Sequence, residues 1–454
     1  MKVIFLVCLF LSIFLGITSC NGNKDEVKPI ITILSSTING YNTSGSHVDI
    51  PVNISIELVF SSSINPAAFE SFFSITSDGT NASYSLSYSN ATSKVTITGI
   101  LEYNKTYKVS LDTELIGGKG EKLSTPLNFS FKTAEDNIIR YASPCVTLGS
   151  CLRSVEMEGT QGKGTFEFYS NYPIYEVNAR WENLTQAILV VHGASHNPDD
   201  YYTYLTNTLE GESLSTSTVL ISPFFRNIST GFSEDFYWEN TDWRRGEQSS
   251  NTNKISSFEV MDLLIEKLSD KELFPVLNKI IITGHSSGAA FTHVYAGADK
   301  AESVHSEISF EYIIANSQFF YYPNGQRINE LSNELYTPEG CLSYDIWPLG
   351  YNSIPLYLSG VTSSDFNSQF VNRSIWYLLG NGNQSDPTLN ITDCENTLQG
   401  STRYKRGENM FRYMELVYPS IHNHSKTIVN GIGHDGSGMY QSSEFKTLLN
   451  KLIK

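Results

Sequence analysis

One twelve-residue segment, from Lys279 to Ala290, constrains the fold of this chain more than any other part of it; it reads KIIITGHSSGAA. An apolar run typical of a buried strand leads into Gly-His-Ser-Ser-Gly, and small residues suited to the start of a helix follow. A sharp turn between a strand and a helix crowds the backbone, so the flanking glycines tolerate almost no side chain. The strained turn would hold the hydroxyl of Ser286 above the end of the strand, where the helix N-terminus favours negative charge. The segment therefore predicts that Ser286 is a nucleophile.

From about Asn137 onward, the chain alternates between apolar strands and helices. The runs expected to form strands are residues 165–169, 187–191, 218–222, 279–283, 310–315, 375–379 and 426–429. Between them, residues 197–209 begin with Asn-Pro-Asp, and residues 257–268 repeat apolar residues on one helical face behind a serine cap. Near-continuous apolar strands joined by helices predict an α/β fold, with a mainly parallel sheet covered on both faces.

Residues 28–136 have a different, all-β pattern, and a chain of 454 residues is long enough for two domains. Residues 52–60 alternate with period two, as do residues 94–98, 106–111 and 127–131. Short strands separated by polar turns predict a β-sandwich. The order of the segments FSSSINP, YKVSL and FSFKT resembles a bacterial Ig-like domain. The resemblance implies a spacer or presenting module.

The amino-acid composition limits the classes of partner that the chain is expected to bind. The chain is 40% hydrophobic and 17% charged, as expected of a globular protein, and its formal net charge is -16. Nucleic acid is excluded as an expected partner, because its binding depends on Lys and Arg that neutralise phosphates. We expect a small-molecule or polymer substrate. The cysteine spacings do not match metal-ligand patterns, and neither a metal nor an organic cofactor is implied.

The N-terminus has the features of an export signal. Lys2 precedes an apolar run that ends at Ile17, and this run is too short for a good membrane-spanning helix. Ile-Thr-Ser-Cys at residues 17–20 resembles a bacterial lipobox, and residues 21–26 resemble the charged surface-export tag of Bacteroidetes lipoproteins. The resemblance implies a signal peptide at residues 1–19, lipidation of Cys20, a linker at residues 20–27 and attachment to the outer membrane or cell surface. Ordinary secretion is the alternative.

Four cysteines remain for an oxidising compartment: Cys145, Cys151, Cys341 and Cys394. An even number outside the cytosol predicts two disulfides. Proximity in sequence favours Cys145–Cys151 and Cys341–Cys394, and two other pairings stay open.

A second segment fits the site at Ser286. The strand at residues 187–191 ends in His192-Gly193-Ala194-Ser195. In α/β-hydrolases a similar His-Gly turn follows the third strand and supplies one backbone N–H to the oxyanion hole. The resemblance implies that Ala194, with Ser195 as the alternative, and Ser287 are the two backbone donors.

The general base is expected last in chain order. His434 lies in the glycine-rich segment GIGHDGSG, after the final strand, and is the candidate. The carboxylate that orients it should follow the strand at residues 375–379. Asp386 is the first carboxylate of that loop and the preferred candidate, and Asp393 is the next. Asp386 could instead only form a turn before a proline.

From about Gly164 to its end, the chain resembles a little-characterised family of secreted bacterial and fungal α/β-hydrolases. The segments that carry the resemblance are WRRG at 243–246, SSFEVMD at 256–262, FP at 274–275, ANS at 315–317, CLSYDIWPLG at 341–350, QGSTRYKRG at 399–407 and GHD at 433–435. Such proteins read Leu-Gly-x-x-Asp after the seventh strand, and the aspartate position is Asn383 here. Either Asp386 replaces that aspartate or the triad is weakened.

These features together predict a surface-anchored serine hydrolase. The most favoured activity is that of an esterase, which uses Ser286, His434 and Asp386 and forms an acyl-enzyme. A peptidase or amidase on the same triad and a binding protein with a degenerate hydrolase fold are the alternatives. Four aromatic residues between the sixth and seventh strands could contact substrate, although core packing is the commoner fate: Tyr321, Tyr322, Trp347 and Tyr351.

Overall fold

The computed structural model describes residues 29–45, 47–137, 139–140, 143–145, 147–176, 178–227, 235–382 and 386–453. The chain divides into two compact units, Met1–Asn137 and Ile138–Lys454. The predicted signal peptide, Cys20 and the linker lie outside the described residues. None of the helices in the described ranges is long and apolar enough to cross a membrane.

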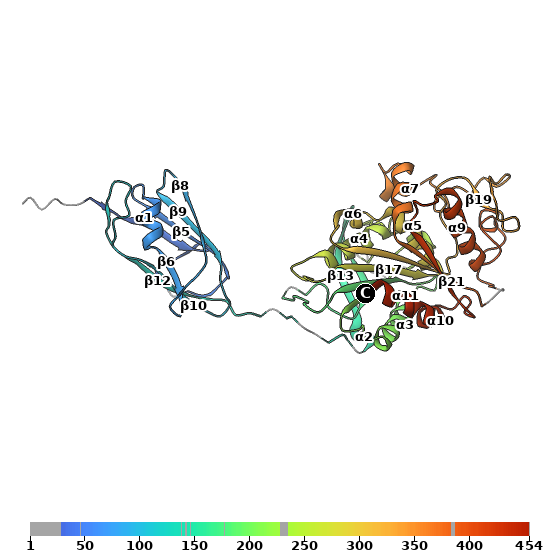
Figure 1. Ribbon diagram of the computed structural model, residues 1–454, viewed down its shortest axis with the longest axis horizontal. Helices are drawn as coiled ribbons and strands as arrows, with labels where there is room; N and C mark the ends of the chain where they lie inside the picture. The colour runs from blue at the N-terminus through green and yellow to red at the C-terminus, as the bar shows by residue number, and fades with distance from the viewer. Residues whose placement is uncertain are drawn as a thin grey trace, which may run out of the picture. The chain divides into compact units, whose positions relative to one another are not determined.

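The N-terminal unit is an all-β sandwich, as predicted (Figure 1). One sheet has the order β4-β12-β10-β6-β7 and the other β3-β2-β5-β9-β8. The strands of the first are His47–Ile50, Leu127–Thr133, Thr106–Leu111, Ser74–Ser77 and Thr80–Asn81. Those of the second are Tyr41–Asn42, Ile33–Ile38, Asn53–Phe60, Lys94–Ile100 and Ser85–Ser89. Every second residue of β5 is buried, and both sheets contribute to one apolar core that includes Phe69 of helix α1 (Pro66–Phe72).

The C-terminal unit is built on one large sheet, whose order within the described residues is β13-β14-β16-β15-β17-β18-β21-β22. In that order the strands are Leu152–Gly159, Gly162–Ser170, Thr218–Pro223, Gln186–Val191, Lys279–His285, Ser309–Ala315, Ile375–Gly380 and His424–Val429. The strands from β16 to β22 run parallel, and β14 is antiparallel to both of its neighbours. Every residue of β15 and β16 is buried, as a sheet covered on both faces requires. The topology confirms the predicted α/β-hydrolase fold.

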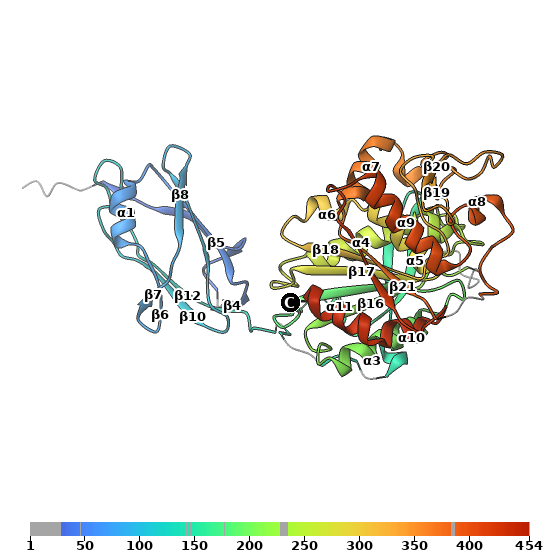
Figure 2. The ribbon, with the colours of Figure 1, turned by 45° about the vertical axis from the view of Figure 1, so that its right-hand side comes forward.

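Helices cover both faces of this sheet (Figure 2). One face carries α3 (Pro198–Gly211), α10 (Gly436–Gln441) and α11 (Ser443–Ile453), and their apolar residues share a core. The other face carries α4 (Ser257–Ser269), α5 (Ser287–Ala298), α7 (Ser363–Asn372) and α9 (Arg403–Val417). The hydroxyl of Ser256 caps α4 by accepting from the N–H of Phe258. Asn197 does not cap α3 in this way, because its side-chain amide donates to Asp200 instead.

Both expected disulfides are formed. Cys145 is bonded to Cys151 and Cys341 to Cys394, with Cα–Cα distances of 5.8 and 5.9 Å. The second bond spans 53 residues and joins the segment after β18 to the loop after β21. It therefore ties two of the chain segments at the carboxyl ends of the parallel strands.

Candidate active site

Ser286 lies at the turn between β17 and α5, with φ 60° and ψ -116°. This positive φ is costly for a residue other than glycine, and the close packing around the turn maintains it. A Cβ on Gly284 would lie 2.3 Å from the carbonyl carbon of Gly288, and one on Gly288 would lie 2.1 Å from the carbonyl oxygen of Val191. Both glycine positions are therefore closed to any side chain. The geometry is that of the strained strand-to-helix turn that the sequence predicts.

Ser286 opens into a cavity of about 400 Å³ at the carboxyl ends of the strands. Its lining brings together residues from six separate parts of the chain: Gly193, Ala194, Ser195, Asn197, Tyr201, His285, Ser286, Ser287, Gln318, Thr388, Arg403, His434, Asp435 and Gly436. The expected backbone donors, Ala194 and Ser287, thus lie at the same cavity as Ser286. Among the described residues, neither N–H donates a hydrogen bond to another protein group. The amide of Ser287 is also the first of α5, where the helix dipole favours negative charge.

His434 lies between β22 and α10 and lines the same cavity. Its Nδ1 is 3.1 Å from Oγ1 of Thr388 and 3.6 Å from Oδ1 of Asp386. Its Nε2 is buried and has no hydrogen-bond partner among the described residues. The ring stacks on that of His285, with 5.0 Å between centroids. The imidazole is therefore held on its Nδ1 side, and its Nε2 is free for a ligand or a reacting group.

Asp386 belongs to a compact polar cluster. Its Oδ1 accepts from the Thr388 hydroxyl at 2.7 Å and from the Thr388 backbone N–H at 3.0 Å. Its Oδ2 accepts from Nε of Arg403, whose Nη2 also donates to the Thr388 hydroxyl at 3.0 Å. Burial raises the pKa of Asp386, but the Thr388 hydroxyl and the Arg403 cation outweigh this effect and hold the pKa at about 2. The carboxylate is therefore ionised at any ordinary pH.

The hydroxyl of Thr388 connects this carboxylate to His434. A hydroxyl has one proton to donate and can accept from several donors. Because Thr388 donates to Asp386, it accepts from Arg403 and from the N–H at Nδ1 of His434. This arrangement fixes the tautomer of His434 and leaves Nε2 with a lone pair.

Burial lowers the pKa of His434 to about 4, and repulsion from Arg403 adds to this effect. Asp386 and Asp435 oppose the shift without cancelling it. The imidazole is consequently neutral at neutral pH, which is the protonation state that a general base requires.

Asn316, directly after β18, holds the loop that carries His434. Its side-chain amide donates to the carbonyl of Gly433 at 2.7 Å, and its Oδ1 accepts from the N–H of Gly380 at 2.8 Å. The residue is fully buried and has φ 48°. It therefore joins the ends of β18 and β21 to the turn before His434. The sequence marks Asn316 and Arg403 only through the family resemblance, and Thr388 has no local pattern that would reveal its contacts.

The other residues that the sequence offers as the acid of the triad either lie away from His434 or are not among the described residues. Asp393 precedes α8 (Cys394–Thr397) and accepts from the side chain of Asn390. Asn383 is not among the described residues. Among the described carboxylates, Asp386 alone has an ion-pair contact to His434 within 4.0 Å.

The four aromatic residues of the segment after β18 do not line the cavity. Tyr321, Tyr322 and Trp347 are buried in the core, and Tyr351 packs against it. Core packing, the commoner fate, is therefore what the structure shows for them.

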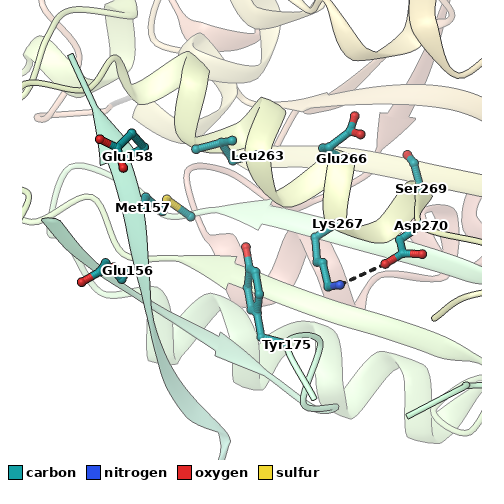
Figure 3. Close-up of a pocket in the computed structure, with 9 residues that line it drawn as sticks. All are labelled: Glu156, Met157, Glu158, Tyr175, Leu263, Glu266, Lys267, Ser269 and Asp270. Carbon is teal, nitrogen blue, oxygen red and sulfur yellow. Dashed lines mark hydrogen bonds and ion pairs between the residues drawn. The ribbon is translucent and has the colours of Figure 1, made fainter. Parts of the chain in front are cut away.

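A separate hollow of about 490 Å³ lies between β13, Tyr175 and α4 (Figure 3). Its lining includes an ion pair of Lys267 with Asp270 at 3.0 Å. Its serine, Ser269, donates its hydroxyl to the carbonyl of Ile265, and no histidine is among its lining residues. It lacks the groups of a serine nucleophile site.

The described residues contain one group of three possible metal ligands, Cys341, Cys394 and Glu395, and its two cysteines are bonded to each other. Because their sulfur atoms form a disulfide, the two cysteines are not available as thiolate ligands.

Comparison with known proteins identifies the N-terminal unit. Residues 34–133 match the family described as a bacterial Ig-like domain. No match is found among curated proteins. The molecule is therefore a bacterial Ig-like domain followed by a unit with the α/β-hydrolase fold.

Several solved structures are similar to part of the chain. One is the poly(3-hydroxybutyrate) depolymerase LpqC from Bordetella parapertussis, with 15% identity and a TM-score of 0.46 over 65% of this chain and 93% of that chain. Another is poly(aspartic acid) hydrolase-1 from Sphingomonas sp. KT-1, with 16% identity and a TM-score of 0.45 over 69% and 99%. A third is the siderophore hydrolase EstB from Aspergillus nidulans, with 14% identity and a TM-score of 0.36 over 68% and 96%.

Proposed function

We propose that the protein is a serine hydrolase that cleaves a carboxylic ester through an acyl-enzyme. The observation that carries the proposal is the shared cavity of Ser286, in its strained turn, and His434, whose buried Nε2 has no other partner among the described residues. A serine at such a turn with a neutral imidazole beside it has the two groups that acyl transfer requires.

In the proposed reaction, Oγ of Ser286 attacks the ester carbonyl while Nε2 of His434 takes the hydroxyl proton. The backbone N–H groups of Ala194 and Ser287 stabilise the oxyanion. The intermediate collapses, the bond to the alcohol breaks, and His434 gives the proton to the leaving oxygen. Water then attacks the acyl-enzyme with His434 again as base, which releases the acid and restores Ser286. Asp386 acts on His434 mainly through the Thr388 hydroxyl.

The test is covalent labelling with a fluorophosphonate probe. We expect the wild type to be labelled and Ser286→Ala to be silent. Ser269→Ala, at the hollow of Figure 3, is the matched serine control and should be labelled like the wild type. Labelling that survives in Ser286→Ala would overturn the proposal.

An ester is favoured over an amide because the carboxylate of Asp386 lies farther from Nδ1 of His434 than the hydroxyl of Thr388 does, at 3.6 Å against 3.1 Å. An amine is the poorer leaving group and demands more of the general acid. Rates with a matched ester and anilide of the same acid would separate an esterase from a peptidase or amidase.

The ion pair of Asp386 with Arg403 favours a second candidate, a binding protein with a degenerate hydrolase site. A carboxylate already paired with a cation stabilises imidazolium less than a free one does. A folded protein that hydrolyses none of a broad panel of acyl esters and peptides, even at high concentration, would support this alternative.

We also propose export, with a lipid on Cys20 that anchors the chain to the outer membrane or cell surface. The two disulfides support an oxidising compartment. Metabolic labelling with an alkyne fatty acid should mark the wild type and not Cys20→Ala; a secreted, unlabelled wild type would leave ordinary secretion as the explanation.

A further inference from the structure

Two arginines contact Gln318, at the wall of the cavity, and a third lines the same cavity. Arg244 donates from Nη1 to the side-chain Oε1 of Gln318 at 2.7 Å, and Arg406 donates to its main-chain carbonyl. Arg403 lines the same cavity as Gln318 and is only 5% exposed. Cationic side chains are thus close to the cavity that contains Ser286, in a chain whose net charge is -16.

The three guanidinium groups differ in the protein groups that compensate their positive charge. Of these three arginines, only Arg403 has a carboxylate within 4.0 Å among the described residues, that of Asp386. Arg406 is satisfied by three main-chain carbonyls, those of Gly400, Gln318 and Asn390. Among the described residues, Arg244 has neither a carboxylate within 4.0 Å nor a main-chain carbonyl acceptor, and its guanidinium lies 5.4 Å from the centroid of the Phe319 ring.

Arg244 instead contacts two neutral side chains. Its Nη1 lies 3.3 Å from Oγ of Ser287 and 2.7 Å from Oε1 of Gln318, and both of these residues line the cavity. Its Nε is buried and without a partner among the described residues. Burial, with repulsion from Arg245 and Arg403, lowers the pKa of Arg244 to about 10. Attraction from Asp242 opposes this lowering only in part. The group remains a cation at neutral pH, and a desolvated cation with no carboxylate within 4.0 Å among the described residues is unfavourable.

The backbone around Arg244 keeps the guanidinium in this place. Arg244 belongs to the short helix η1 (Asp242–Arg245), in which Trp243 is buried and stacks on Phe225. The carbonyl of Trp243 accepts from the hydroxyl of Ser257 at the start of α4. A cation that is fixed in this way is pre-organised to bind an anion.

We propose that Arg244 and Gln318 form a carboxylate-binding subsite, so that the ester cleaved at Ser286 carries a free carboxylate in its acyl part. The inference rests on the proposed function. Arg244 contacts the side chain of Ser287, the residue next to the nucleophile. The acyl part of the ester stays in the site during both acylation and deacylation. A carboxylate on the acyl part would therefore compensate the positive charge of Arg244 in both steps. The planar guanidinium suits a carboxylate, and Nη2, which donates to none of the described residues, is left to bind one.

The test compares esters that differ only at the far end of the acyl chain. The 4-nitrophenyl monoesters of glutarate, adipate and suberate are paired with the 4-nitrophenyl esters of pentanoate, hexanoate and octanoate. We expect kcat/KM to be about ten- to a hundredfold higher for at least one monoester than for its neutral partner, the range for hydrogen bonds to charged groups. Arg244→Gln should lose most of this ratio. Arg245→Gln is the control and should keep it, because Arg245 pairs with Asp242 at 2.7 Å.

A binding measurement covers the case in which Arg244→Gln does not fold. Adipate should raise the melting temperature of the Ser286→Ala protein in a saturable way, and hexanoic amide should not. Neutral esters that are hydrolysed as well as every monoester, together with no adipate binding, would overturn the subsite alone. Absence of fluorophosphonate labelling would instead overturn the proposed function, so the two failures are distinguishable.

Discussion

At the scale of single residues, the distinctive feature of the site is the hydroxyl of Thr388. It donates to Asp386 and accepts from His434, so it transmits the orientation that a carboxylate would otherwise supply directly. The hydroxyl carries only a partial charge, whereas the full charge of Asp386 lies 3.6 Å from the ring. Orientation and charge stabilisation are thus divided between two residues.

Thr388→Val tests this division. The change keeps the shape of the side chain and removes the three hydrogen bonds of the hydroxyl. We expect kcat to fall about ten- to a hundredfold, up to the lower end of the range of a general-base contribution, because His434 itself remains. KM should change little, because the hydroxyl acts through His434. Thr388→Ser should retain most of the activity. Steady-state kinetics on one aryl ester suffices, and equal kcat values for wild type and Thr388→Val would contradict the role.

The pKa of His434 gives a second prediction. A general base works unprotonated, so the rate is lost as pH falls through its pKa, which burial and Arg403 lower to about 4. We expect the acid limb of the kcat/KM profile near pH 4, below the usual histidine value of about 6.5. Arg403→Gln removes one cause of the lowering and should move the limb to higher pH. A limb near 6.5 in the wild type would contradict the environment described for His434.

Site residues that stand in a local sequence pattern can be predicted, whereas those that reach the site through long-range contacts cannot. Ser286 and His434 stand in glycine-rich segments whose pattern is readable within a few residues. Thr388 and Arg403 meet His434 only because the loop after β21 folds against the start of α9. No periodicity or spacing in the sequence encodes that contact.

At the scale of elements, the ends of the parallel strands build the site, and Asn316 joins them. Its two hydrogen bonds connect β18, β21 and the loop of His434. Gly382 lets these loops approach closely, since a Cβ there would lie 2.1 Å from the carbonyl carbon of Gly431. The position of the imidazole thus depends on an amide that has no role in the chemistry.

Asn316→Ala removes both bonds and leaves the buried N–H of Gly380 and the partly buried carbonyl of Gly433 without their partner. We expect a loss of about 1–3 kcal/mol in the free energy of unfolding, as for an unsatisfied buried group, and at least a tenfold lower kcat. Urea unfolding and steady-state kinetics measure the two effects. Asn333→Ala is the matched control, because Asn333 also has positive φ but is exposed. A stable Asn316→Ala protein with unchanged kcat would contradict the positioning role.

The elements themselves were largely predictable. Fully buried parallel strands such as β15 and β16 are runs of apolar residues and can be recognised one at a time. The strand β13 was missed, because its burial pattern alternates weakly and it pairs only with β14 at the edge of the sheet. Helix α1 was missed as well, since it is a short insertion between strands, although Asn65 and Pro66 are a cap and first-turn residue.

At the scale of the whole molecule, the two units have separate cores. One core contains residues of the Ig-like strands and Phe69. The other unit has apolar clusters on both faces of its sheet. Each of the elements that supply the cavity belongs to the unit from Ile138 to Lys454. The groups that the proposed reaction uses therefore all belong to the C-terminal unit.

A fragment of residues 138–454 tests this independence. It retains both disulfides and the complete sheet, so we expect it to fold and to keep the kcat/KM of the full chain on a soluble aryl ester within about twofold, a difference below 0.5 kcal/mol. Calorimetry should show one transition for the fragment and an additional one for the full chain, since separate cores unfold separately. An inactive or unfolded fragment would contradict the independence of the units. If the fragment loses activity only on an insoluble polyester, the Ig-like domain acts on access to the substrate, because the reacting groups are the same in both proteins.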